Sequence, residues 1–183
     1  MLLSLDISTS CTGWCLFNQD ELCDHGFIKL SKHKGLFEKA NRIKSELLLI
    51  AQKHHITEVV VEENMQAFRP GLSSAKTLMT LSQFNGVVRW ICHSDMSVPV
   101  KSFNVNSARK IVGIKLDRKS DVTTKDQILH WVLNNNANID LPTRLVTRGK
   151  HAGKVRPCDE SYDMADAYVI GRAHLIEKLK KIE

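Results

Sequence analysis

Residues 2–17 read LLSLDISTSCTGWCLF, and this stretch decides the fold. Over residues 2–8, leucine and isoleucine alternate with Ser4, Asp6 and Ser8, which is the two-residue period of a β-strand. A second run follows at residues 12–17, then a polar turn at 18–20 and a third run at 21–30. Such short connections predict three antiparallel strands, with an acid, Asp6, in the middle of the first.

Outward from this stretch, the chain alternates between helical and strand patterns. Helices are expected at residues 36–55, 74–93, 107–112, 123–133 and 161–180, and further strands at 56–61 and 98–103. Residues 142–157 are expected to form a polar, basic loop. The pattern predicts an α/β fold in which helices flank a mixed central sheet. A length of 183 residues suits one domain spanning 1–183.

Positive charge is concentrated in one part of the chain. The net charge is +6, and residues 101–156 hold twelve Lys/Arg against four Asp/Glu, whereas residues 1–100 hold ten of each. A basic surface of this kind attracts a polyanion such as a nucleic acid. A solvated basic surface without a partner is the alternative.

The sequence also bears on location and on bound zinc. No export signal and no apolar run of about 18 residues is seen, so we expect a cytoplasmic protein with no membrane span. An odd number of cysteines, five, favours reduced thiols. Cys11, Cys15, Cys23 and His25 are close enough to suggest zinc, but their apolar strands favour a core role.

Four acids stand where burial would make a carboxylate costly. They are Asp6 in the first strand, Glu62 at the end of a β-branched run, and Asp163 and Asp166 three apart in a helix of small residues. Taken singly, each of these acids could equally be a solvent-exposed residue. Together they predict a bound cation, because buried carboxylates oppose folding unless neutralised. Oxygen ligands of this kind suit Mg²⁺, with Mn²⁺ able to substitute.

The chain resembles the RuvC-type Holliday junction resolvases, particularly the short phage-encoded ones. Four segments carry the resemblance: LSLDISTSCTGW (3–14), VVVEE (59–63), VG (112–113) followed by TKDQILHWV (124–132), and DMADA (163–167). The resemblance implies a ribonuclease H-like fold, a homodimer, two Mg²⁺ ions and a nuclease that cuts Holliday junctions and other branched DNA. The resemblance also implies that the protein is located in the cytoplasm of a bacterium or of a phage-infected host.

The resemblance assigns Asp6, Glu62, Asp163 and Asp166 as metal ligands and Lys125 as the cation beside the attacked phosphate. Glu63 competes with Glu62, because adjacent strand residues face opposite ways. The DNA-binding residues are expected to be Met65, Phe68, Arg69, Arg109, Lys110, Arg148, Lys150 and Lys154. Met65 and Phe68 are candidates for an apolar wedge, with packing against the next helix as the alternative. Trp14 and Trp90 are expected in the core.

Two rival functions remain open. A ribonuclease H-type enzyme that cuts RNA–DNA hybrids would share the acids. An actin-like ATPase fragment would share the first strand, but it would need Gly-rich phosphate-binding loops, which this sequence does not contain. For the homodimer, the helix at 74–93 is the expected interface, with Met79, Gly86 and Trp90 on the partner face. Burial of both faces of this helix within one subunit is the alternative.

Overall fold

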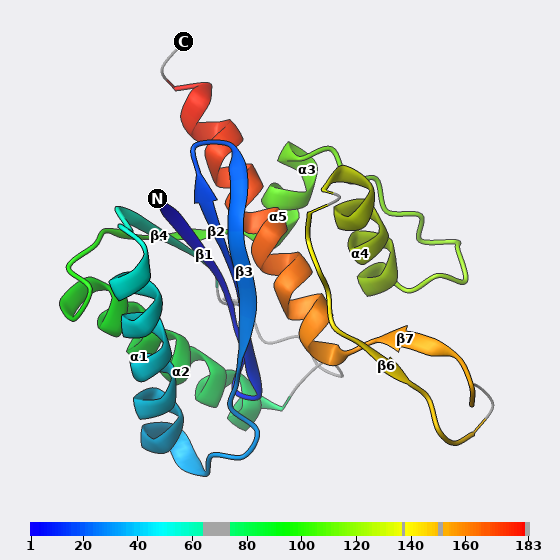
Figure 1. The fold of residues 1–183 in the computed structure, drawn as a ribbon, viewed down its shortest axis with the longest axis horizontal. Helices are drawn as coiled ribbons and strands as arrows, with labels where there is room; N and C mark the ends of the chain where they lie inside the picture. The colour runs from blue at the N-terminus through cyan, green and yellow to red at the C-terminus, as the bar shows by residue number, and fades with distance from the viewer. Residues whose placement is uncertain (64–73, 137, 150–151, 182–183) are drawn as a thin grey trace.

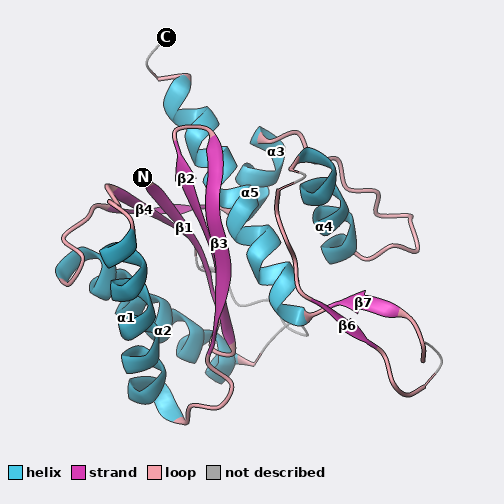
Figure 2. Cartoon of the chain, in the orientation of Figure 1, coloured by secondary structure: helices cyan, strands magenta, loops and turns pink. Residues whose placement is uncertain are grey.

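The computed structural model describes residues 1–63, 74–136, 138–149 and 152–181. Figure 2 shows the helices and strands in this part of the chain. In chain order they are β1 (Leu2–Ile7), β2 (Cys11–Asn18), β3 (Glu21–Lys29), α1 (Gly35–Lys53), β4 (Glu58–Glu62), α2 (Ala75–Ser94), β5 (Val100–Phe103), α3 (Val105–Ile111), α4 (Thr124–Asn135), β6 (Thr143–Leu145), β7 (Val155–Pro157) and α5 (Asp159–Leu179).

The central sheet is mixed. Its strand order is β3-β2-β1-β4-β5. β1 pairs antiparallel with β2 and parallel with β4, and β4 pairs parallel with β5. The three antiparallel strands predicted from residues 2–30 are therefore confirmed, and the carboxyl ends of β1, β4 and β5 lie at one edge of the sheet.

Helices cover both faces of the sheet (Figure 1). α1 and α2 pack on one face, where the core includes Leu3, Leu47 and Phe84. α3, α4 and α5 lie over the other face, where Phe17 and Ile170 are fully buried. The α/β fold with helices on both sides of a mixed sheet is thus as predicted. In the described residues, no helix combines the length and the apolar character needed to cross a membrane.

Two expectations about local structure were wrong. The basic segment 142–157 is not simply a loop, because β6 and β7 pair there as an antiparallel hairpin that projects from the body (Figure 1). Trp90 is not a core residue: its side chain is 64% exposed on α2, because the opposite face of this helix, with Val88 and Ile91, is the one that is buried. Trp14 is half-buried against Gly26.

Helix α5 lies directly on the sheet because glycine stands at the points of contact. A Cβ atom built on Gly13 of β2 would overlap the backbone of Asp163 and Met164, and one on Gly171 of α5 would overlap the ring of Phe17. Gly13 is also the cross-strand neighbour of Asp6. The absence of a side chain at Gly13 therefore sets the distance between Asp6 and the start of α5.

The close contact at Gly13 leads to a prediction about stability. Gly13→Ala should lower the free energy of unfolding by about 3 kcal/mol or more, since the obstructing atoms are backbone and α5 would have to move away. Chemical denaturation measures the change. Cys23→Ala is the control, because Cys23 is an exposed, free cysteine of the neighbouring strand β3 and its replacement should change stability by less than about 0.5 kcal/mol. Equal stability of the two variants would contradict this account of α5 packing.

Candidate active site

Three elements bring the four acids together at one edge of the sheet. Asp6 lies near the carboxyl end of β1, and Glu62 is the last residue of the parallel neighbour β4. Asp163 and Asp166 lie one turn apart near the start of α5, whose backbone contacts β2 beside Asp6. Residues from both ends of the chain and its middle therefore share one site, as the sequence predicts.

The carboxyl groups of Asp6 and Glu62 are close enough to share a hydrogen bond. Burial holds the pKa of Asp6 well above its ordinary value, and the charges of Glu62, Asp166 and Asp163 raise it further. The pKa of Glu62 is raised chiefly by burial as well. The pair consequently keeps a proton to a higher pH than two exposed carboxylic acids would.

The two acids of α5 are also disfavoured as anions. Burial raises the pKa of Asp163 to about 6, with Asp166 adding repulsion and the Cys11 thiol and Lys125 lowering it. The pKa of Asp166 is raised by burial, against the opposing effects of Arg109 and Lys125. All four acids thus lie in surroundings that oppose negative charge.

Arg109 belongs to this cluster. Its Nη2 atom lies 3.2 Å from Oδ1 of Asp166, and the two side chains are only 19% and 16% exposed. Its Nε atom is buried without a hydrogen-bond partner in the described part of the chain. Arg109 was expected on the DNA-binding surface, and the structure instead directs it at Asp166. The spacing of residues in the sequence does not predict this contact, because Arg109 and Asp166 lie on different helices, α3 and α5.

The donor set fits a hard divalent cation. Carboxylate oxygens are the ligands that Mg²⁺ and Mn²⁺ prefer, and a cation would favour the charged form of these acids, which burial disfavours in all four. As the described side chains stand, no group of three or more His, Cys, Asp or Glu is arranged to hold an ion. The carboxylate oxygens of the four acids contact each other, the Cys11 thiol and Arg109. A bound cation would have to replace these contacts.

Glu63 differs in its contacts from Glu62. The carboxylate of Glu63 accepts a hydrogen bond from Nδ2 of Asn104 at 3.3 Å, whereas Glu62 contacts Asp6. The geometry of the two side chains therefore favours Glu62 as a member of the acidic cluster. Lys125 is exposed at the start of α4, with Nζ 5.5 Å from the centre of the Tyr162 ring. This aromatic contact was not expected from the sequence.

The other predicted DNA-binding residues are spread over two regions. Lys110 is exposed on α3, and Arg148 and Lys154 are exposed between β6 and β7. Met65, Phe68, Arg69 and Lys150 lie outside the described residues.

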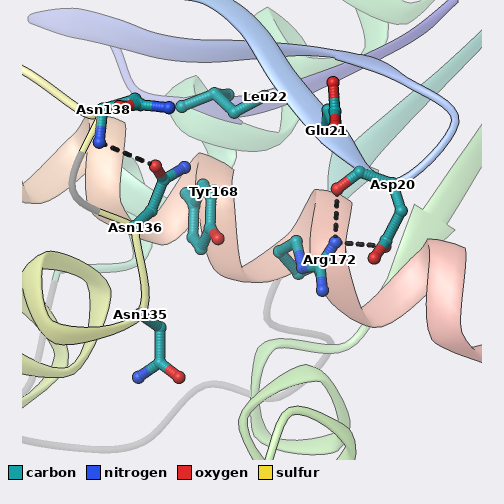
Figure 3. Close-up of a pocket in the computed structure, with 8 residues that line it drawn as sticks. All are labelled: Asp20, Glu21, Leu22, Asn135, Asn136, Asn138, Tyr168 and Arg172. Carbon is teal, nitrogen blue, oxygen red and sulfur yellow. Dashed lines mark hydrogen bonds and ion pairs between the residues drawn. The ribbon is translucent and has the colours of Figure 1, made fainter.

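A separate hollow, lined by none of the four acids, lies beside the middle of α5 (Figure 3). Arg172 donates hydrogen bonds there to the carbonyl and the carboxylate of Asp20, and Tyr168 and Asn136 form part of the lining. Arg172 is nine residues beyond Asp163, which is about 13 Å along a helix. This hollow is therefore separate from the acidic cluster.

Comparisons with known proteins agree with the motifs. No family model matches the chain. The crossover junction endodeoxyribonuclease RuvC of Ehrlichia ruminantium (strain Welgevonden) is 23% identical over 181 residues, which is 95% of each chain. Among solved structures, RuvC of Thermus thermophilus in complex with a Holliday junction substrate matches with a TM-score of 0.67 and 16% identity, over 98% of this chain and 94% of that one.

The yeast mitochondrial Holliday junction resolvase Ydc2 matches with a TM-score of 0.58 and 14% identity, over 98% of this chain and 80% of that one. The fold is therefore ribonuclease H-like, as predicted. The resemblance to RuvC-type resolvases is confirmed in sequence and in fold.

The raised pKa of Asp163 predicts how stability depends on pH. An unfolded aspartic acid loses its proton near pH 4, whereas Asp163 in the metal-free fold keeps it to about pH 6. Rising pH between these values therefore favours unfolding. At pH 7, Asp163→Asn should stabilise the metal-free protein by on the order of 1–2 kcal/mol.

Denaturant unfolding at pH 4 and pH 7 in EDTA tests this prediction, with Asp121→Asn as the control at an exposed acid. The gain from Asp163→Asn should shrink at pH 4 and in the presence of Mg²⁺, which would favour the wild-type carboxylate. A gain that is the same at both pH values would show that Asp163 is not destabilised by its charge.

Proposed function

We propose that this chain, which resembles the RuvC-type resolvases in sequence and fold, is an endonuclease that resolves Holliday junctions and other branched DNA. The observation that carries the proposal is the cluster of four partly buried acids, Asp6, Glu62, Asp163 and Asp166, whose pKa values are all raised. A nuclease needs such a cluster to hold divalent ions beside a phosphodiester. The relative of 23% identity is a crossover junction endodeoxyribonuclease.

We assign the four acids as ligands of two Mg²⁺ ions, with Mn²⁺ as a substitute. When bound, the two ions would activate water and stabilise the leaving oxygen of the phosphodiester. The chain supplies the positions of the ligands: two come from rigid parallel strands and two from one turn of α5.

Lys125 and Arg109 supply positive charge at the cluster. Both oppose the rise in the pKa of Asp166, so both lie close enough to act on charge in the site. Lys125 is exposed and reaches outward from α4, which suits a contact with the attacked phosphate. Arg109 is held by Asp166, so we assign it to the positioning of that acid.

Binding of the DNA backbone is assigned to exposed basic residues. Lys110, Arg148 and Lys154 are exposed in the structure, and Met65, Phe68, Arg69 and Lys150 remain sequence-based assignments. Such contacts with phosphates provide affinity without reading the base sequence. We take residues 1–183 as a single nuclease domain, and its substrate places it in the cytoplasm of a bacterium or of a phage-infected host.

A panel of substrates tests the function directly. With Mg²⁺, the protein should cut a four-way junction in preference to a linear duplex and to an RNA–DNA hybrid, and EDTA should abolish the cleavage reversibly. Preference for the hybrid would instead support the ribonuclease H-type alternative. Cleavage in chelator would overturn the metal mechanism.

Substitutions in the acidic cluster separate catalysis from binding. Asp6→Asn and Glu62→Gln should each reduce junction cleavage by at least about a hundredfold, because each removes a metal ligand, and should leave junction affinity within about threefold. Glu63→Gln is a matched control, since the neighbouring Glu63 contacts Asn104 instead of Asp6. Rates are measured under single-turnover conditions. Equal losses in Glu62→Gln and Glu63→Gln would overturn the choice of Glu62.

We propose a homodimer as the active form, because two equivalent sites match two symmetric cuts. The face of α2 assigned to the partner is exposed in the single chain: Met79 is 63% and Trp90 is 64% exposed. Between them, Gly86 has open space around it. Large exposed apolar side chains beside a glycine suit close packing against a second helix.

Light scattering tests this assembly. The wild-type protein should have twice the mass of the 20.7 kDa chain at micromolar concentration. Gly86→Arg should shift it towards the monomer and uncouple the paired cuts, because the new side chain fills the space for the partner. Lys53→Arg, a change on α1, serves as the control. A wild-type monomer that still resolves junctions would contradict the proposal.

A further inference from the structure

We propose that one DNA strand leaves the cleavage site through a groove beside Asp163, held between a lysine-containing turn and the β6–β7 hairpin. The inference rests on the proposed function and adds two binding walls to it. Asp163 is one of the lining residues of the groove, so a strand bound at the acidic cluster would lie next to the groove's opening. We call it the Asp163 groove; its lining residues are Ser10, Cys11, Lys29, Ser31, Arg144, Cys158, Asp159, Glu160 and Asp163.

The first wall is the connection between β3 and α1, residues 30–34, together with the first turn of α1, which begins at Gly35. Ser31 of this connection lines the groove. Lys32 and Lys34 are exposed there. Phe37 is 79% exposed, more than any other large apolar residue in the described part of the chain. Exposed cations next to an exposed aromatic ring suit a nucleic-acid strand, because cations contact phosphates and the ring stacks on a base.

The shape of this turn is fixed by its own contacts. The side chain of Glu38 accepts a hydrogen bond from the backbone N–H of Lys34 at 2.8 Å. Nζ of Lys39 donates to the carbonyl of Thr9 at 2.6 Å, which ties α1 to the turn that follows β1. The cations and the ring are therefore presented on a structured turn at the same end of the sheet as Asp6.

The second wall is the β6–β7 hairpin, which has two different faces. Arg144 and Arg156 are cross-strand neighbours, and so are Leu145 and Val155. Adjacent strand residues point to opposite faces, so one face carries the arginines and the other the apolar pair. Arg144 lines the groove and acts electrostatically on Glu160, and Arg156 acts on Asp126. Arg144 is thus turned towards the first turn of α5, and Arg156 lies closer to the first turn of α4, which contains Asp126.

The acids in the groove do not cancel these charges. Nζ of Lys29 lies 2.6 Å from Oε1 of Glu160, so the charge of Glu160 is already paired. Asp159 is exposed in the first turn of α5, where the helix dipole favours an acid. Of the basic residues on the two walls, Arg144 lines the groove itself, and Lys32, Lys34 and Arg156 are exposed on the elements that border it. They outnumber Asp159, the lining acid that is neither paired with Lys29 nor a proposed metal ligand, so the groove and its borders attract the phosphates of a strand.

Binding measured against salt concentration tests both walls. In a Glu62→Gln background with Mg²⁺, junction affinity is measured by fluorescence anisotropy for Lys32→Ala/Lys34→Ala and for Arg144→Ala/Arg156→Ala. Each pair should weaken binding and reduce the slope of log affinity against log salt by about one for each phosphate that the protein no longer binds. Lys180→Ala/Lys181→Ala removes the same charge at the far end of α5 and should leave the slope unchanged.

A base analogue tests the position of the strand. With 2-aminopurine placed in the strand next to the cleaved bond, binding should quench its fluorescence, and Phe37→Ala should restore the fluorescence and weaken binding about tenfold. Phe37→Trp should keep the quenching. Thermal unfolding checks that each variant is folded.

The outcomes separate the two proposals. If the wild-type protein neither binds nor cuts junctions, the proposed function fails. If it cuts junctions but either wall's pair of substitutions leaves the salt slope like that of the Lys180/Lys181 control, the groove proposal is overturned. The same holds if Phe37→Ala leaves the 2-aminopurine signal unchanged.

Discussion

The site depends on how closely α5 approaches the sheet. Gly13 leaves room for the backbone of Asp163 and Met164, and Gly171 lets the same helix rest on Phe17. Without the first contact, Asp163 and Asp166 would stand off from Asp6, which is the strand neighbour of Gly13. The packing of the α5 backbone on β2, together with the pairing of β1 and β4, therefore brings the four acids close to one another.

That packing has an electrostatic cost. Four carboxyl groups are brought into buried surroundings, where burial is the main cause of each raised pKa. Arg109 and Lys125 lower the pKa of Asp166 against the effect of burial, and Asp6 and Glu62 share a hydrogen bond. A fold optimised only for stability would not keep such a cluster, and stability that is given up at a functional site is common in enzymes. A cation bound as proposed would offset this cost, and metal affinity and stability would then be linked.

Much of this arrangement is predictable from the sequence because it is local. The alternation in residues 2–8 and the β-branched run before Glu62 determine strands, and the three-residue spacing of Asp163 and Asp166 determines a shared helix face. The contact of Arg109 with Asp166 is not predictable in this way, since it joins separate helices. The exposure of Trp90 was missed because periodicity does not tell which of two apolar faces of a helix is buried. The hairpin was missed because its strands are only three residues long.

The side chains of the β6–β7 hairpin contribute little to the packing of the two hydrophobic cores. Its strands contribute no buried residue to either core, and Leu145 and Val155 are 61% and 66% exposed. Its base is fixed by backbone contacts, such as the N–H of Cys158 with the carbonyl of Pro142. Sequence changes in these strands can therefore accumulate without affecting the folding equilibrium. During evolution or in engineering, the arm can be exchanged as a module, and one catalytic framework can be refitted to differently shaped DNA.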